Sequence, residues 1–204
     1  MSYLNTGKRF NPTTPVVLNL ILLNGAVFLI QNIFDGPFAK ITTFMALWPI
    51  ESGQFKPYQL VTHMFTHGGL AHILFNMFGL WIFGSVLEKL WGGKRFLVFY
   101  FACGLAAGVA QLFLSNAPAI GASGAIMGLF GAFAYLFPNT EMFIFPIPFP
   151  IKAKWAVAGL ALLDLFGGVN PTGSNIAHFA HLGGVVAGLL LAIYWKKTNH
   201  RNYR

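Results

Sequence analysis

The chain has 204 residues, of which 56% are hydrophobic and only 9% are charged. Soluble domains carry about 25% charged residues, so this composition excludes an ordinary soluble domain and indicates a helical membrane protein. The net charge of +8 comes from short basic clusters between apolar runs, which is typical of membrane-protein loops, and we expect no nucleic-acid partner.

Six apolar segments are long enough, or nearly long enough, to cross a bilayer, since a spanning helix needs about 20 mostly apolar residues. The stretch 37–50 after the first segment is more polar and is interrupted by prolines, so we expect an interfacial loop with short helical pieces, and with Trp48 and Tyr58 at headgroup level. The sequence thus predicts an all-α, polytopic six-helix membrane bundle, built as a single domain over residues 1–204. The predicted spans are 15–34, 69–87, 95–114, 120–137, 152–168 and 177–195.

The distribution of Lys and Arg predicts how the bundle is oriented. With the N-terminus inside, 11 of the 13 basic residues fall in cytoplasmic segments, and only Lys40 and Lys56 fall outside. The positive-inside rule therefore predicts cytoplasmic tails at residues 1–14 and 196–204. The first apolar run follows basic residues, as in a signal peptide, but no small-residue cleavage site follows it, so we expect a retained first span.

Polar residues at membrane depth are costly and mark a functional site by default. They gather at the starts of the second, fourth and sixth spans, which all run from the outside inwards in this orientation. The polar residues at these starts are His63, His67, His72 and Asn76, then Ser123, then His178 and His181. Of these, Ser123, Asn76, His72 and His181 fall within the first turns of the three spans, so the sequence predicts that one serine, one asparagine and two histidines share one depth below the outer surface.

Small residues indicate which of these spans touch. Gly184 and Gly188 form a small-xxx-small face on the sixth span, and Gly124, Gly128 and Ala132 form another on the fourth. Such faces let helix backbones approach closely. If the two faces meet, the start of the fourth span comes within hydrogen-bond reach of the start of the sixth.

These parts suit nucleophilic acyl transfer. A serine hydroxyl is a poor nucleophile until a base takes its proton, and His181 is the candidate base for Ser123. A Ser–His dyad is expected, with Asp164 as a weaker candidate for a third group. The amide of Ser123 at a helix start, together with the side chains of Asn76 and His72, could donate hydrogen bonds to an oxyanion.

The motifs together resemble the rhomboid family of intramembrane serine proteases. They are His72-x-x-x-Asn76, Gly121-x-Ser123-Gly124 and Ala180-His181-x-x-Gly184-x-x-x-Gly188, with an acidic residue at Glu88 after the second span. The resemblance covers a core of about residues 58–195 and fits the six-span bacterial form. It implies a protein of the bacterial inner membrane, whose active site opens to the outer side.

The resemblance also implies an activity and the roles of residues. It implies a serine endopeptidase that cuts single-span membrane proteins near the outer boundary of the bilayer and needs no metal, ATP or other cofactor. Ser123 would be the nucleophile and His181 the general base and acid, with His72 and Asn76 in the oxyanion site. Two features depart from the family pattern: Tyr58-Gln59 replaces a Trp-Arg pair, and Met127 replaces an aromatic residue that stacks on the histidine.

Several other interpretations remain open from the sequence. Ser123 could be a packing residue, Asn76 could hold helices together, and His178 could be a satisfied core residue. His63 and His67 could bind a metal, although we favour hydrogen bonding at a loop–helix junction. The competing functions are a haem or metal protein that uses His72 and His181 as ligands, and an inactive relative that binds transmembrane segments. The sequence indicates no particular oligomeric state.

Overall fold

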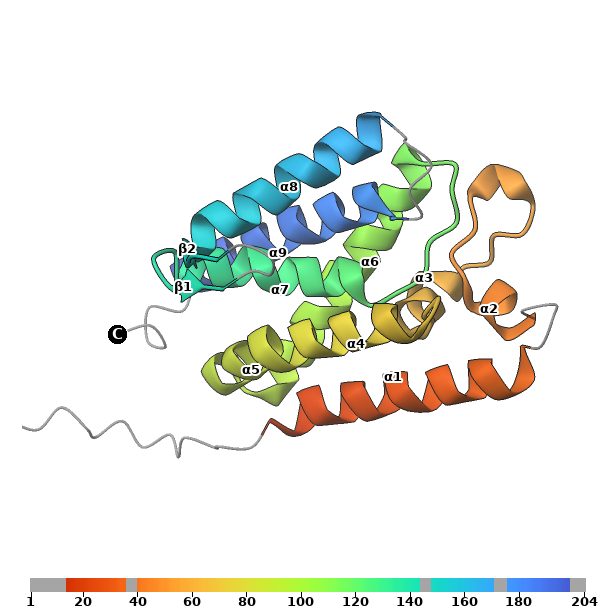
Figure 1. The fold of residues 1–204 in the computed structure, drawn as a ribbon, viewed down its shortest axis with the longest axis horizontal. Coiled ribbons are helices and arrows are strands. Elements are labelled where there is room, and N and C mark those ends of the chain that lie inside the picture. The colour runs from red at the N-terminus through yellow and green to blue at the C-terminus, as the bar shows by residue number, and fades with distance from the viewer. Residues whose placement is uncertain (1–13, 36–39, 144–147, 171–175, 199–204) are drawn as a thin grey trace, which may run out of the picture.

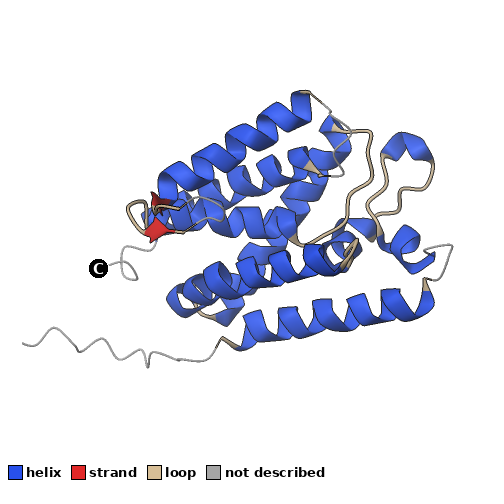
Figure 2. Ribbon diagram, viewed as in Figure 1, coloured by secondary structure: helices blue, strands red, loops and turns tan. Residues whose placement is uncertain are grey.

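The computed structural model describes residues 14–35, 40–143, 148–170 and 176–198, and these are almost entirely helical (Figures 1 and 2). The only strands in these ranges are two short ones that pair antiparallel between α7 and α8. The elements in chain order are α1 (Pro15–Phe34), α2 (Lys40–Met45), the 3₁₀ turn η2 (Ile50–Ser52), α3 (Gln59–Thr62), the 3₁₀ turn η3 (His63–Phe65), α4 (Leu70–Gly79), the π-helical turn η4 (Leu80–Gly84), α5 (Ser85–Trp91), α6 (Gly93–Leu114), α7 (Ser123–Leu136), β1 (Glu141–Met142), β2 (Ile151–Lys152), α8 (Ala153–Val169) and α9 (His178–Thr198).

All six predicted spans are present as helices, and the predicted all-α membrane fold is confirmed. Within the described ranges, four helices are long and apolar enough to cross a bilayer: α1, the continuous helix Leu70–Trp91 formed by α4, η4 and α5, α6, and α9. The other two, α7 with 14 residues and α8 with 17, are shorter. The predicted tails lie mostly outside the described residues, at 1–13 and 199–204.

The bundle is built around α7 (Figure 1). This helix packs against α9, α6 and α8, and nine of its 14 residues are buried. The outer faces of α1, α4 and α8 expose large apolar side chains such as Leu22, Phe75 and Leu163. Because a surface of this kind is stable against lipid chains but not in water, the protein is an integral membrane protein.

The segment between α1 and α4 forms the predicted loop with short helical pieces. Gln59 organises it from inside: its side-chain oxygen accepts hydrogen bonds from the amides of Trp48 (3.3 Å) and Lys56 (3.1 Å). Tyr58 stacks on Phe44 with ring centroids 4.9 Å apart. The Tyr58-Gln59 pair therefore holds the loop by internal contacts, and the headgroup position of Trp48 and Tyr58 stays a prediction.

The chain enters α7 through a loop that is fastened to the first one. Leu47 and Ala119 exchange two backbone hydrogen bonds of 2.9 Å, and the Gly121 amide donates to the His63 carbonyl (2.8 Å). Gly121 has a φ of +118°, a conformation that L side chains rarely adopt. These contacts fasten the start of α7 to the loop between α1 and α4.

Candidate active site

The site begins at the first residue of α7. Ser123 opens the helix directly after Ala122. The first four amides of an α-helix have no partner within the helix, and the partial positive charge of the helix dipole lies at this end. The Ser123 hydroxyl is thus presented beside amides that can donate hydrogen bonds.

Glycines bring α9 against the start of α7. A β-carbon at Gly184 would overlap the Gly124 carbonyl oxygen, and one at Gly188 would overlap the Gly128 carbonyl oxygen. The two backbones are therefore in direct contact, as the small-residue faces predict. Any larger side chain at Gly184 or Gly188 would push the helices apart.

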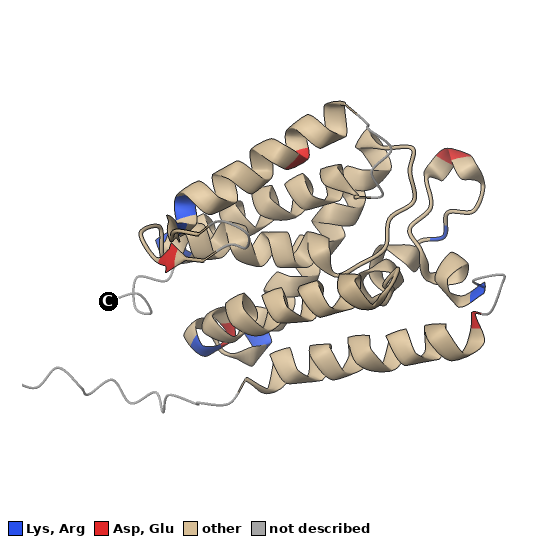
Figure 3. Cartoon of the chain, in the orientation of Figure 1, with Lys and Arg blue, Asp and Glu red and all other residues tan. Residues whose placement is uncertain are grey.

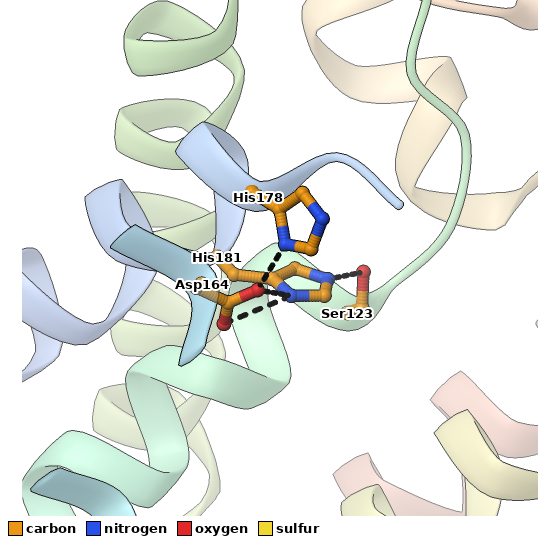
Figure 4. Close-up of polar contacts among 4 residues, drawn as sticks. All are labelled: Ser123, Asp164, His178 and His181. Atoms are coloured by element: carbon orange, nitrogen blue, oxygen red, sulfur yellow. Dashed lines mark hydrogen bonds and ion pairs between the residues drawn. The ribbon is translucent and has the colours of Figure 1, made fainter. Parts of the chain in front are cut away.

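This contact places the serine and the histidine together (Figure 4). The Nε2 atom of His181 lies 2.8 Å from the Ser123 Oγ atom, within ordinary hydrogen-bond distance. On the other side of the same ring, Nδ1 lies 3.1 and 3.2 Å from the two carboxylate oxygens of Asp164, near the end of α8. The side chains of His181 and Asp164 are 18% and 11% exposed, so water reaches the group without surrounding it.

The carboxylate has a second histidine partner. The Nδ1 atom of His178, one turn before His181 on α9, lies 2.8 Å from the Asp164 Oδ1 atom (Figure 4). The sequence favoured a Ser–His dyad, with Asp164 as a weaker candidate and His178 as a core residue, whereas the structure brings Asp164 against His181 and His178 against Asp164. The signal that could have found them is a carboxylate in an apolar span, facing two histidines at i and i+3.

The two proposed oxyanion residues lie on α4, beside the start of α7. A β-carbon at Gly121 would lie 2.7 Å from the His72 Nε2 atom and 3.7 Å from the Ser123 Oγ atom. The side-chain amide of Asn76 donates one hydrogen bond to the His72 carbonyl (2.8 Å), and its second N–H is not used in that bond. The structure therefore brings His72 close to Ser123 and puts Asn76 one turn further along the same helix.

The other two histidines of this region have structural contacts. His63 donates from Nδ1 to the Gln59 carbonyl (2.7 Å), and the backbone of His67 is bonded to Gln31 through both its N–H and its C=O. Burial lowers the pKa of each imidazole to about 4, so both are neutral near pH 7. No cluster of three or more metal-ligating side chains occurs in the described part of the chain.

Met127 lies one turn after Ser123 and packs into an apolar cluster with Val157 of α8 and Val185 of α9. This cluster joins α7, α8 and α9 by apolar contacts. The expected packing of the thioether on the His181 ring stays a prediction.

Comparison with known proteins agrees with this arrangement. The rhomboid domain family model matches residues 54–198. The chain belongs to the rhomboid family. The rhomboid resemblance of the sequence is thereby confirmed, and the match spans every described element from α3 to the end of α9.

Named relatives occur in bacteria and in mitochondria. Rhomboid protease GlpG of Pectobacterium atrosepticum is 31% identical over the whole chain, which spans 70% of that protein. Rhomboid protease GluP of Bacillus subtilis is 34% identical over 66% of the chain, which spans 25% of that protein. Rhomboid protein 1 of yeast mitochondria is 31% identical over 68% of the chain and 42% of its own length. These relatives support a rhomboid-type serine protease.

Proposed function

We propose that this rhomboid protein is an intramembrane serine endopeptidase that hydrolyses a peptide bond in or next to a substrate's transmembrane segment. The observation that carries the proposal is the 2.8 Å contact between Ser123 and His181, which lie 58 residues apart in the chain. A serine hydroxyl and an imidazole within hydrogen-bond reach are the minimum apparatus for nucleophilic acyl transfer.

The reaction follows from this geometry. As the Ser123 Oγ atom attacks the scissile carbonyl carbon, its proton passes to the Nε2 atom of His181, and the carbonyl π electrons move onto the oxygen. When the tetrahedral intermediate collapses, the C–N bond breaks and His181 returns the proton to the leaving amine. A water molecule, activated by the same imidazole, then hydrolyses the acyl-enzyme and frees Ser123.

The negative charge on the tetrahedral oxygen needs hydrogen-bond donors. The candidate donors are the amide of Ser123, the imidazole of His72, which lies beside Gly121 next to Ser123, and the side-chain amide of Asn76, one turn after His72 on α4. Donors fixed in place before the reaction stabilise the oxyanion without reorganisation. We assign these three groups to the oxyanion site, with Gly121 leaving the room between His72 and Ser123.

The charge distribution supports a site that lies below the outer surface of the membrane. Most Lys and Arg residues of the described chain lie at the end where α5 finishes and α8 begins (Figure 3), which the positive-inside rule assigns to the cytoplasm. The starts of α4, α7 and α9 then face the outer side of an inner membrane. In this orientation the tails 1–14 and 196–204 would be cytoplasmic, and the proposed catalytic core is at about 58–195.

The short length of α7 sets the depth. Its 14 residues span about 21 Å at about 1.5 Å per residue, against a hydrocarbon core of about 30 Å. If α7 ends at the inner boundary, Ser123 lies roughly 9 Å below the outer one. A single-span substrate would thus be cut just inside the outer edge of the bilayer, where its helix can unwind into the site.

The competing functions have less support. A haem ligand needs a free ring nitrogen, but both nitrogens of His181 are engaged, one by Ser123 and one by Asp164. An inactive relative would have no need to keep Ser123 and His181 in hydrogen-bonding contact.

The test is cleavage of a model single-span protein by the purified protein in proteoliposomes. Ser123→Ala is expected to abolish cleavage, while Ser52→Ala, which removes an exposed hydroxyl in the first loop, is expected to leave it intact. Cleavage that persists in Ser123→Ala would overturn the proposal.

A further inference from the structure

We infer that Asp164 is a positioning residue, held by His178, which fixes the tautomer and the orientation of His181; this inference rests on the protease function proposed above. The expected dyad thereby becomes a four-residue chain that runs from Ser123 through His181 and Asp164 to His178 (Figure 4). Each link in the chain is a contact between 2.8 and 3.2 Å.

Asp164 determines the tautomer of His181. A neutral imidazole has one N–H and one bare nitrogen, and an ionised carboxylate can only accept hydrogen bonds. Because Nδ1 of His181 faces both oxygens of Asp164, the proton of the neutral ring lies on Nδ1. The bare lone pair is then on Nε2, facing the Ser123 hydroxyl, which is the tautomer that a general base requires.

Asp164 also stabilises the charge that forms on His181 during the reaction. When His181 takes the serine proton it becomes an imidazolium, and the Asp164 carboxylate faces the opposite edge of that ring. A partner of opposite charge at hydrogen-bond distance stabilises the charged intermediate, most of all where water is scarce. Asp164 thus acts only through His181, since no described contact joins it to Ser123.

Asp164 is in turn held in place by His178. His178 donates from Nδ1 to the Oδ1 atom of Asp164 at 2.8 Å, shorter than either contact to His181. Room for this ring comes from Gly167, one turn after Asp164 on α8: a β-carbon there would lie 2.6 Å from both Cε1 and Nε2 of His178. The glycine and the histidine together lock α8 onto the start of α9 and keep the carboxylate turned towards His181.

Among the described groups around His181, only Asp164 carries a negative charge. Asp164 faces His181 from α8, His178 lies on α9 itself, and His72 of α4 lies beside Gly121, near the Ser123 that His181 contacts. The adjoining stretch of α6 contributes alanines, Ala106, Ala107 and Ala110, which pack against Gly183. Asp164 is therefore the one anionic side chain among these neighbours of His181.

The test is the steady-state kinetics of full-length Asp164→Asn in proteoliposomes. We expect kcat to fall at least about tenfold with KM close to the wild-type value, because Asp164 does not contact substrate. The acid limb of the pH–rate profile should move to lower pH, since a neighbouring negative charge no longer favours the protonated imidazole. Asp164→Glu, which restores the charge, should recover part of kcat and return the acid limb towards its original position.

A second arm uses a matched pair of glycines on α8. Gly167→Ala should displace His178 and lower kcat, whereas at Gly159 an added β-carbon meets nothing within 4 Å, so Gly159→Ala should not. Alanine favours a helix over glycine, so a loss at Gly167 would not come from a weakened helix. This arm decides the matter if Asp164→Asn fails to fold.

The outcomes separate the two proposals. Wild-type protein that does not cleave, or cleavage that survives Ser123→Ala, removes the protease function itself. If wild type cleaves and Ser123→Ala does not, then wild-type kcat in Asp164→Asn overturns the positioning role. A lower kcat with an unmoved acid limb also overturns the positioning role, because the loss of a merely structural residue would have that effect. If Asp164→Asn does not fold, equal kcat values in Gly167→Ala and Gly159→Ala overturn it instead.

Discussion

The contact between α7 and α9 and the attachment of α1 hold membrane helices together by opposite means. Where Gly184 and Gly188 of α9 meet Gly124 and Gly128 of α7, no side chain separates the two helices, and backbone lies against backbone. Helix α1 is tied by buried polar side chains: Glu88 accepts hydrogen bonds from the Val16 and Val17 amides (3.0 and 2.8 Å), and Gln31 bonds the backbone of His67. The glycine contact sets the distance between α7 and α9 closely, whereas the hydrogen bonds hold α1 in place without close packing of its backbone.

The difference follows from what each contact must achieve. Ser123 and His181 have to lie within hydrogen-bond distance, and a shift of about 1 Å at such a site costs about 100-fold in rate. Helix α1 carries none of the proposed catalytic groups, so it needs attachment more than exact placement. Within hydrocarbon an unpaired amide is costly, and Glu88 satisfies two amides at the start of α1.

The largest effect should come from opening the glycine contact. Gly184→Ala places a β-carbon on the Gly124 carbonyl and forces α9 away from α7, so we expect a loss in kcat of about 100-fold and in unfolding free energy of about 1–3 kcal/mol. Cleavage assays and thermal unfolding measure the two losses. The matched control is Gly25→Ala on α1, where an added β-carbon meets nothing within 4 Å; equal effects at the two glycines would show that close approach is not what α7 and α9 require.

The second largest effect should come from acid, which should lower the unfolding free energy through His63 and His67. The pKa of His63 and of His67 is lowered from 6.5 to about 4, chiefly by burial, so protons bind more readily to the unfolded state. The unfolding free energy should therefore be highest above pH 6.5 and fall towards pH 4, by up to about 3 kcal/mol for each histidine. Unfolding measured against pH in wild type and in His63→Gln checks this, and an unchanged slope in the variant would contradict it.

The smallest effect should come from the charge at the start of α1. Glu88→Gln keeps one acceptor for the amides of Val16 and Val17 but loses the other and the negative charge at a helix N-terminus, which should cost about 2 kcal/mol of unfolding free energy. The kcat value should stay near that of wild type, as it should in the control Glu51→Gln in the exposed turn η2. A large loss of kcat in a stable Glu88→Gln protein would show that α1 positions the site after all.

The sequence was sufficient wherever a local pattern carries the structure. Apolar length identifies the six helices, and the i, i+4 spacing of Gly184 and Gly188 predicts the face that meets α7. The fourth and sixth spans cross the bilayer in the same direction, which brings Ser123 and His181 to the same depth. Each of these depends on residues close in sequence or on the alternation of spans.

The parts that the sequence left open depend on how one helix is turned against another. Asp164 and His181 share one site because of the rotation of α8 on α9, which no periodicity in either helix encodes. Gly167 has Gly168 beside it but no small residue four positions before it, so it gives no small-xxx-small signal, although it makes the room for His178. The bonds between Gln31 and His67 join residues 36 positions apart, and the sequence does not indicate the pairing.

The most direct test of the central claim is labelling by a fluorophosphonate, which reacts with an activated serine hydroxyl. Mass spectrometry of the labelled wild-type protein should locate the adduct on Ser123, and His181→Ala should remove the labelling because the proton acceptor is gone. Labelling at another serine, or undiminished labelling of Ser123 in His181→Ala, would contradict the account.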